Sequence, residues 1–367
     1  MKICFIANWN SPHTKHWIDP ILNGQHQIKL LSYTPVVRFD RRIEIIDLTK
    51  FSNIAKIKYA QWGIWINCYL RNYKPHILHA LQIPGAGWLG RSANYHPFVI
   101  SAWGSDLLIE PKKSWFRKFL VKNVLHSCDG LTVPTNLLYT TAVNIGISED
   151  RIHLIPWGID TENFYPDPDD RFRTRRKLNI HDNERIIFCP RGIKDIYSID
   201  ILLAAFAKLV KNINNIKLLL LRFNIDNVYM SHLEEFIQKN SLDRHVIWIE
   251  GQNDPHKMAN LYRASDVIVS IPVSEGFGFS VYEAMACGCP TVITNLDVFN
   301  NLIDRLHTSK VPPRDVEITT IAIEEMLKNI EFREIIVKNS LSIAFSQNIS
   351  SQAEKTLSLY NELANTR

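Results

Sequence analysis

Residues 267–294 combine four kinds of local sequence in an order that few folds accommodate. The apolar, β-branched run 267–271 is typical of a buried parallel strand, and two glycines follow it before a short helical segment. Gly288 and Pro290 end that segment, because a left-handed glycine terminates a helix and proline cannot continue one. A second β-branched run begins at Thr291. The stretch therefore predicts a strand, a glycine-rich loop, a helix and another strand.

The same alternation of strand and helix runs through most of the chain. Strands are expected at 2–7, 28–32, 43–47, 75–80, 98–102, 130–133 and 152–156, and again at 185–189, 216–221, 246–250, 267–271 and 291–294. Helices are expected at 17–23, 53–72, 114–125, 137–145, 200–211, 232–240 and 256–263, with a helical tail over 318–362 that is interrupted near 347–350. Strands separated by helices indicate parallel sheets.

The chain divides where this alternation stops, near residue 158, and restarts, near residue 185. At 367 residues it is also too long for one ordinary core. The expected fold is α/β, with two Rossmann-like, doubly wound domains facing each other across a cleft. We expect the first domain at 1–160 and the second at 161–347, with a C-terminal helix, about 348–367, packing back on the first. Ligands of such sheets bind beyond the carboxyl ends of the strands.

The composition is that of a globular protein, with 46% hydrophobic and 22% charged residues, which excludes long disordered regions. The net charge of +5 is uneven, because basic residues are in excess over the first 160 positions and acidic residues slightly so afterwards. The asymmetry favours an anionic partner for the first half, or reflects ordinary surface bias. No motif for nucleic acid is present, so we expect no nucleic-acid partner.

The six cysteines lack the spacing of a metal site or a disulfide framework, and we expect them to be buried free thiols. No apolar run is long enough for a signal peptide or a membrane-spanning helix. These features predict a cytoplasmic protein, with peripheral contact on the inner face of a membrane as a further option.

Two glutamates, Glu275 and Glu283, flank the glycine-rich loop and the helix that follows it. A carboxylate accepts hydrogen bonds from two hydroxyls at once, which suits a sugar or a ribose diol, and a helix start can hold a diphosphate. Alternatively, Ser280 and Glu283 fit a capping box, which would make Glu283 purely local. On spacing alone both interpretations remain open.

This stretch resembles a known family signature. Ser274-Glu-Gly-Phe-Gly, followed by Glu283-Ala-Met-Ala-Cys-Gly-Cys-Pro290, is similar to the E-x7-E signature of retaining nucleotide-sugar glycosyltransferases of family 4, the glycosyl transferases group 1, which have the two-domain GT-B architecture. Further segments agree with the family along nearly the full chain, at 75–80, 99–106, 152–164 and 261–266.

The resemblance implies a hexosyltransferase that retains anomeric configuration and builds a surface polysaccharide or a glycolipid. It implies a nucleoside diphosphate sugar as donor, a carbohydrate or lipid-linked acceptor, no cofactor and no metal. The first domain would bind the acceptor and the second the donor. Glu275 would face the donor sugar, the loop amides of Gly276, Phe277 and Gly278 would hold sugar hydroxyls, and Glu283 would hold the ribose diol.

Arg191 and Lys194 follow the strand at 185–189, and two cations there suit a diphosphate. A solvated loop pair is the alternative. The resemblance implies that Arg191 and a lysine neutralise the leaving diphosphate. Tyr197 occupies the usual lysine position, so Lys194 would substitute from one helical turn earlier.

Candidates for acceptor chemistry lie in the first domain, although a lone histidine is more often structural. They are His13, His16, His79 and Asp106. Trp103 stands where many relatives have a histidine beside the reacting centre, which leaves Asp106 as the remaining matching polar residue. The resemblance also implies a mechanism in which the leaving phosphate itself takes the acceptor proton. We assign catalytic roles to Glu275, Asp106 and His13.

Two remaining segments carry open alternatives. Residues 167–170 superficially resemble a metal-binding DxD site but lie in the linker, without the strand that such a site follows. Residues 112–122 place basic and aromatic side chains at helical spacing. That segment would dock on anionic lipid headgroups, or it would bury its aromatic face in the core. Rival functions are a nucleotide-sugar epimerase or hydrolase on the same fold, and a non-catalytic partner subunit.

Overall fold

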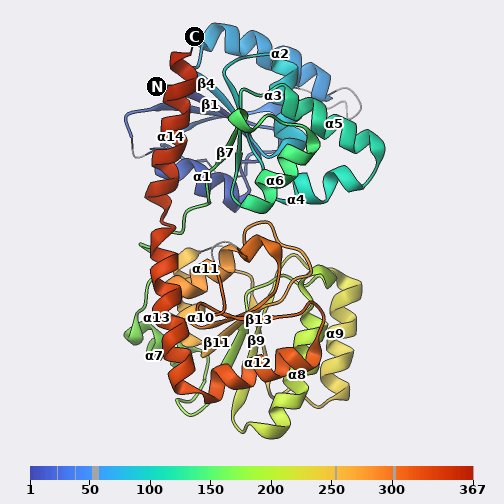
Figure 1. The fold of residues 1–367 in the computed structure, drawn as a ribbon, viewed down its shortest axis with the longest axis vertical. Coiled ribbons are helices and arrows are strands. Elements are labelled where there is room, and N and C mark those ends of the chain that lie inside the picture. Colours follow the sequence, from blue (N-terminus) through green and yellow to red (C-terminus); the bar gives the residue numbers. More distant parts are fainter. Residues whose placement is uncertain (23, 38, 52–57, 253, 301–302, 367) are drawn as a thin grey trace. The chain divides into compact units, whose positions relative to one another are not determined.

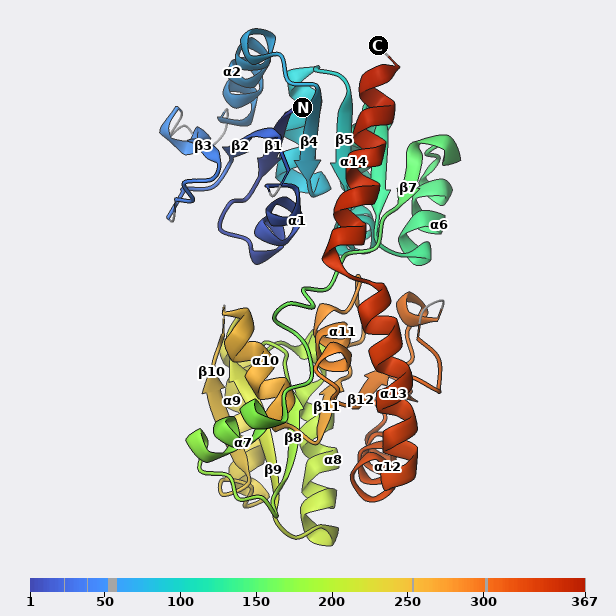
Figure 2. The same ribbon diagram turned by 90° about the vertical axis from the view of Figure 1, so that its left-hand side faces the viewer.

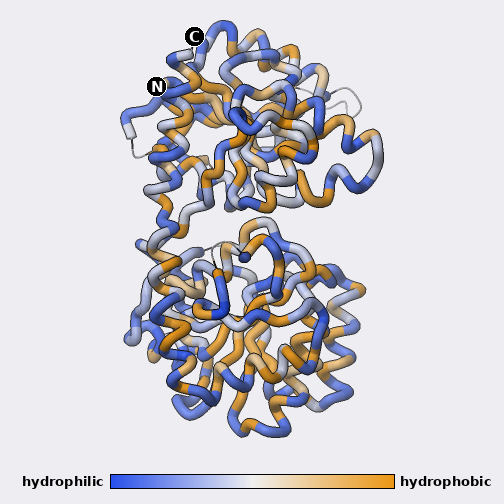
Figure 3. Tube along the Cα trace, viewed as in Figure 1, coloured by the Kyte–Doolittle hydropathy of each residue, from blue (hydrophilic) through white to orange (hydrophobic). Residues whose placement is uncertain are grey.

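The computed structural model describes residues 1–22, 24–37, 39–51, 58–252, 254–300 and 303–366. The chain forms two compact units, one of Met1–Gly158 with Ile349–Arg367 and the other of Ile159–Asn348. Each unit contains one parallel sheet surrounded by helices, drawn in Figure 1. Hydrophobic segments gather along the strands at the centre of each unit, as Figure 3 shows. This pattern fits parallel sheets, whose strands are buried on both faces and are therefore almost continuously apolar.

The sheet of the first unit has seven parallel strands in the order β3-β2-β1-β4-β5-β6-β7. Strand β1, in the interior of the sheet, pairs with β2 and β4, so that Ile3 lies opposite both Ile28 and Ile77. The strands are β1 Lys2–Ala7, β2 Gln27–Ser32, β3 Glu44–Asp47, β4 Ile77–Leu81, β5 Phe98–Ser101, β6 Gly130–Val133 and β7 Ile152–Leu154. The order reverses between β1 and β4, which makes the sheet doubly wound.

The helices of the first unit include one from the far end of the chain, α14 Ile349–Asn365, which packs against α1 and β4. The others are α1 Pro12–Leu22, η1 Leu48–Lys50, α2 Lys58–Tyr73, η2 Ile83–Gly87, α3 Trp88–Ala93, α4 Ser105–Leu108, η3 Glu110–Lys112, α5 Trp115–His126, α6 Asn136–Ile145 and η4 Glu149–Arg151.

The second unit repeats the plan with six parallel strands in the order β10-β9-β8-β11-β12-β13, and its order reverses between β8 and β11. The strands are β8 Arg185–Cys189, β9 Ile216–Arg222, β10 Val246–Glu250, β11 Val267–Ser270, β12 Thr291–Thr294 and β13 Ser309–Val311.

Helices cover both faces of this second sheet, as Figure 2 shows. Helix α8 packs against α9 and α12, while α10 packs against α7 and α11. The helical elements are α7 Pro168–Lys177, η5 Asp195–Tyr197, α8 Ile199–Asn212, α9 Asn227–Lys239, α10 Pro255–Ala264, α11 Phe279–Ala286, η6 Asp297–Phe299, α12 Val316–Lys328 and α13 Ile330–Ser346.

The prediction of two doubly wound α/β domains is confirmed, while several helix boundaries differ from those expected. The helix expected at 17–23 already begins at Pro12, because proline has the backbone geometry of a first helical turn. His13 and His16 therefore lie on a helix and not in a loop. Residue 23 and the first part of the helix expected at 53–72 lie outside the described residues.

The segment expected to be a linker contains a helix, α7, which sequence reasoning missed. Asp167 caps it by accepting a hydrogen bond from the Asp170 amide, and Pro168 begins it. Basic residues in its last turn complement the helix dipole. The interval between residues 158 and 185, where no element was expected, therefore includes a regular surface helix.

The cysteines are all free, but the prediction that they are buried is wrong for Cys68, which is exposed on α2. Among the residues that the structure describes, no helix is both long and apolar enough to cross a bilayer.

Candidate functional site

Strands β8 and β11 lie side by side at the point where the order of the second sheet reverses. Arg191 follows β8, Ser270 ends β11, and Glu275 lies in the loop after β11. The Arg191 guanidinium donates from Nε to the Ser270 hydroxyl at 3.0 Å and pairs through Nη2 with the Glu275 carboxylate. Only 13% of the Arg191 side chain and 15% of the Glu275 side chain are exposed. The ion pair thus holds the loop after β11 against the end of β8.

The loop between β11 and α11 turns tightly at Gly278, whose φ of 91° is left-handed. A Cβ on Gly278 would lie 2.7 Å from the Phe299 ring, so only glycine fits there. The Phe277 side chain is buried and stacks on Tyr282, with ring centroids 4.9 Å apart. The Phe277 ring is therefore part of the core, and we propose only the backbone amides of the loop as contacts for a ligand. One of these amides, that of Gly276, donates to Glu275 Oε1 at 2.8 Å.

Glu283 lies in α11 and accepts a hydrogen bond from the Tyr262 hydroxyl of the neighbouring helix α10, at 2.8 Å. Burial raises the pKa of Glu283 to about 7, although this hydrogen bond and the charge of Arg191 act in the opposite direction. The capping-box alternative is wrong, because α11 begins after Gly278 and Ser280 is already inside the helix. Glu283 is thus a half-buried carboxyl with a tertiary partner.

The cations after β8 differ from each other. The Arg191 guanidinium lies over the Tyr197 ring, 5.0 Å from its centroid, and its burial contradicts the alternative of a solvated loop pair. Tyr197, at the position of the family lysine, thus packs its ring against the Arg191 guanidinium. Lys194 precedes η5 and has no ion-pair partner within the described ranges. Its ammonium group remains available to an anion.

The first unit brings aromatic side chains together at the carboxyl end of its sheet. The His13 ring on α1 makes edge contacts with Trp103, after β5, and Trp157, after β7, with centroids 5.5 and 5.2 Å apart. His16 is stacked on Trp157, 6.1 Å between centroids. The protein around His13 lowers the pKa of its imidazole by desolvation, although the residue is partly exposed, and this favours the neutral form at pH 7.

Asp106 is 1% exposed, and its carboxylate is surrounded by backbone amides. It accepts hydrogen bonds from Trp103 at 3.0 Å, Gly104 at 2.8 Å and Ile83 at 3.2 Å. Burial raises the pKa of Asp106, and these amides oppose that shift. The carboxylate therefore ties the loop after β5 to η2, the segment after β4.

His79 is fully buried, and both of its ring nitrogens are engaged. Nδ1 is hydrogen-bonded to the Tyr360 hydroxyl on α14, and Nε2 to the Ser101 hydroxyl at 2.8 Å. Burial lowers the pKa of His79 to about 3. This candidate for acceptor chemistry is instead a neutral core histidine that attaches α14 to the sheet.

Two of the carboxylates in the DxD-like residues 167–170 already have protein partners. Asp167 caps α7, and Asp170 pairs with Arg173 and, at 2.9 Å, with Arg263. The described part of the chain contains no group of three or more His, Cys, Asp or Glu side chains that could hold a metal ion.

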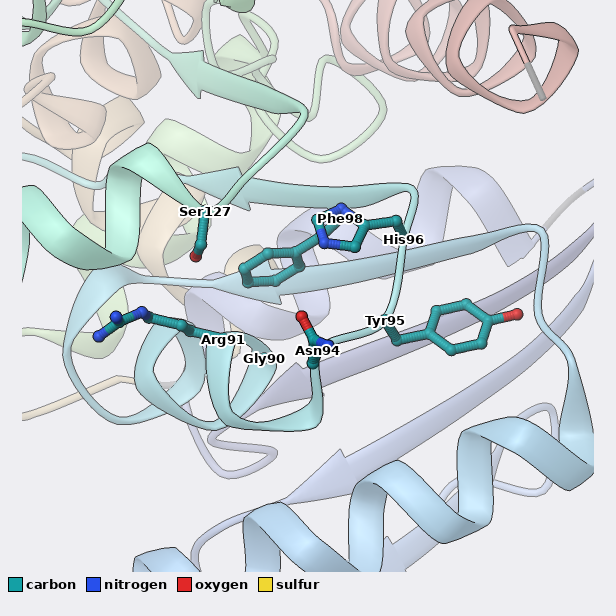
Figure 4. A pocket seen from close by; sticks show the side chains of 7 residues that line it. All are labelled: Gly90, Arg91, Asn94, Tyr95, His96, Phe98 and Ser127. Carbon is teal, nitrogen blue, oxygen red and sulfur yellow. The ribbon is translucent and has the colours of Figure 1, made fainter.

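A cavity of about 240 Å³ lies elsewhere in the first unit, at the amino end of β5 (Figure 4). Phe98 begins that strand, whereas Trp103 follows its other end. The cavity is therefore separate from the residues assembled at the carboxyl end. It is lined by Gly90, Arg91, Asn94, Tyr95, His96, Phe98 and Ser127.

Sequence reasoning missed Tyr262 and Ser270 as parts of the site. Tyr262 lies within a segment that matches the family pattern, 261–266, but its role depends on α10 packing against α11. Ser270 contacts Arg191 only because β11 pairs with β8. Neither relationship follows from local spacing.

Comparison with known families finds two matches along the chain. Residues 170–342 match the family described as glycosyl transferases group 1. Residues 2–135 match the family described as glycosyl transferase 4-like.

Similar proteins include the alpha-monoglucosyldiacylglycerol synthase of Streptococcus pneumoniae, 29% identical over 66% of this chain and 50% of that protein. The chain spans about half the length of the curated relatives it matches. Among solved structures, the sucrose-phosphate synthase of Thermosynechococcus elongatus aligns over the full length of both chains, with a TM-score of 0.85 and 19% identity. Anabaena Alr3699/HepE in complex with UDP and glucose aligns over 99% of this chain and 100% of that one, with a TM-score of 0.84 and 16% identity. These structures share the fold described above.

Proposed function

The chain belongs to the glycosyl transferases group 1, and on that premise we propose that it moves a hexose-type sugar from a nucleoside diphosphate sugar to an acceptor hydroxyl. In this proposal the anomeric configuration is retained, and the product is a surface polysaccharide or a glycolipid.

One observation carries the donor half of the proposal. Arg191, Glu275 and Glu283 come from three separate segments and meet at the carboxyl edge of one sheet, beside the start of α11. A guanidinium, two carboxyls and the positive end of a helix dipole match the diphosphate, the sugar hydroxyls and the ribose diol of such a donor.

The Arg191–Glu275 ion pair suggests how the donor enters. A diphosphate competes with Glu275 for the guanidinium, since a phosphate group accepts the same forked hydrogen bonds. Glu275 is then released toward the sugar, while Lys194 adds a second positive charge. The amides of Gly276, Phe277 and Gly278 hold sugar hydroxyls, and Glu283 holds the ribose.

The first unit takes the acceptor in this proposal. Asp106 positions the loop that carries Trp103, and His13 lies beside that tryptophan. A neutral His13 can accept or donate one hydrogen bond with an acceptor hydroxyl. The proton of that hydroxyl passes to the leaving phosphate on the same face of the sugar, so retention requires no separate strong base.

Neutralisation of the leaving diphosphate by Arg191, Lys194 and the start of α11 would need no metal ion. We therefore propose metal-independent transfer without a cofactor. A lipid acceptor is supported by the similarity to a protein named alpha-monoglucosyldiacylglycerol synthase.

A thermal-shift panel of UDP, GDP, ADP and dTDP sugars tests the donor class. A donor present at 100 times its dissociation constant stabilises the protein by about 2.7 kcal/mol. No shift with any nucleotide sugar would contradict donor binding and favour a non-catalytic subunit. Incubation with labelled donor alone separates transfer from the alternatives, because an epimerase or hydrolase converts the donor without an acceptor. Repeating the incubation with EDTA tests whether conversion of the donor is independent of metal.

A further inference from the structure

The first two turns of α5 and the preceding η3 expose aromatic and basic side chains together. We propose that this segment is a docking surface for an anionic lipid bilayer. The docking surface is defined by its aromatic and its basic members: Trp115, Phe116, Phe119, Lys112, Lys118 and Lys122. The proposal concerns a different unit from the one that holds Arg191 and Glu275, so it goes beyond the donor site.

The aromatic rings of the docking surface are not part of the core. Trp115 is 81% exposed, Phe116 51% and Phe119 56%. The alternative of an amphipathic helix with its aromatic face in the core is therefore wrong. The core contacts come from the second half of the helix, from Val121, Val124 and Leu125, and Figure 1 shows α5 among the outer helices of its unit. Three exposed rings within five residues form an apolar patch of the kind that enters a membrane interface.

The positive charges around these rings are only partly compensated. Glu110 pairs with Lys113 at 2.5 Å and with Arg117 at 2.6 Å. Lys112, Lys118 and Lys122 have no ion-pair partner in the ranges that the structure covers. Three free cations beside exposed aromatic rings complement a surface of negatively charged headgroups.

The charges also favour a bilayer over a second copy of the chain. A symmetric contact between two copies would place these lysines against their own counterparts, and like charges repel. Because no described helix can span a bilayer, we infer peripheral contact in which α5 lies in the interface plane.

Vesicle flotation with the full chain tests the docking surface. We expect binding to phosphatidylcholine vesicles that contain phosphatidylglycerol, weakening as salt is added, and little binding to pure phosphatidylcholine vesicles. Replacing Lys112, Lys118 and Lys122 with Gln should weaken binding by about fivefold per lysine. Trp115→Ala with Phe119→Ala should also weaken it, whereas Trp115→Phe should retain binding but lose a blue shift in tryptophan fluorescence on vesicle addition.

Phe172→Ala is the matched control, because Phe172 is 54% exposed on the basic helix α7, where neighbouring Arg171 and Arg173 are paired with carboxylates. It should bind vesicles like the unmodified protein. Equal binding to neutral and anionic vesicles, or an unaltered triple-lysine variant, would overturn the proposal. The proposal would also be overturned if the unmodified protein self-associated and did not bind vesicles, and if Trp115→Ala abolished that self-association. Donor-induced thermal shifts measured on the same variants should equal those of the unmodified protein. If the unmodified protein itself showed no such shift, this result would contradict the proposed transfer reaction and not the docking surface.

Discussion

The Tyr262 hydroxyl donates a hydrogen bond to Glu283 Oε2 at 2.8 Å, which joins α10 to α11 beneath the loop after β11. Tyr262 is fully buried, and its ring contacts those of Phe164 and Phe188. The tyrosine therefore fixes the direction of a carboxyl that we propose to hold the ribose of the donor.

Removing the Tyr262 hydroxyl while keeping the ring should weaken donor binding. In Tyr262→Phe, Glu283 loses a hydrogen bond that lowers its pKa, so the pKa should rise further. We expect roughly tenfold weaker binding of the donor, corresponding to about 1.4 kcal/mol, and a pH midpoint of binding displaced upward. Titration calorimetry over a pH series measures both quantities. Tyr282→Phe, on the same helix as Glu283, is the control, and a Tyr262→Phe variant with unchanged affinity and midpoint would argue against this role of Tyr262.

Donor affinity should rise with pH through about 7, the pKa of Glu283. Ribose hydroxyls donate to a carboxylate, so the donor favours the ionised form and affinity falls as Glu283 is protonated. Nucleotide sugars suit the measurement, because their diphosphate diester does not titrate near neutral pH. In Glu283→Gln the affinity should be weaker and independent of pH; a slope that persists there would assign the titration to another group.

The same pKa shift predicts an effect on the stability of the ligand-free protein. Because the folded pKa of Glu283 lies above its unfolded value, the folded state binds more protons between the two, and its contribution to stability declines as pH rises toward 7. Urea unfolding at a series of pH values measures this decline. Its slope should be smaller in Glu283→Gln than in the unmodified protein.

Glu275→Gln should separate nucleotide binding from transfer. The substitution removes the charge that competes for Arg191, so a free nucleoside diphosphate should bind about tenfold tighter. Transfer should nevertheless fall by at least about tenfold, since a neutral amide could not stabilise positive charge on the sugar. Glu250→Gln, an exposed glutamate at the end of β10, is the control. Weaker diphosphate binding in Glu275→Gln would contradict the competition.

Tyr360→Phe should weaken the attachment of α14 to the first unit. His79 would lose the partner of Nδ1 inside the core, at a cost of about 1–3 kcal/mol. Thermal unfolding should show a lower midpoint, with donor affinity unchanged because the donor residues lie in the other unit. Tyr165→Phe, at a ring that is 41% exposed, should leave the midpoint in place. If Tyr360→Phe and Tyr165→Phe had the same thermal unfolding midpoint, the hydrogen bond between His79 and Tyr360 would not contribute to stability.

Local sequence was sufficient for the elements with strong periodic patterns. The β-branched run 267–271 and Gly288 predicted β11 and the end of α11, because burial on both faces and left-handed backbone each demand particular residue types. Helix α7 was missed, since its polar composition has no apolar face and only its cap and terminal charges indicate a helix. Helix α9 begins at Asn227 and not at the expected residue 232, because Asp226 caps it by accepting hydrogen bonds from the Val228 and Tyr229 amides.

By itself, the sequence determined the two doubly wound units and the identity of Arg191, Glu275 and Glu283 as candidates, because these depend on local order and residue chemistry. Only the tertiary structure decided that Glu283 is not a helix cap and that its carboxyl has a tertiary partner, since that partner, Tyr262, comes from another helix. Packing likewise decided that His79 is a core residue and that the Trp115 ring is exposed. Burial and partners depend on contacts between segments distant in the chain, and no spacing within one segment specifies them.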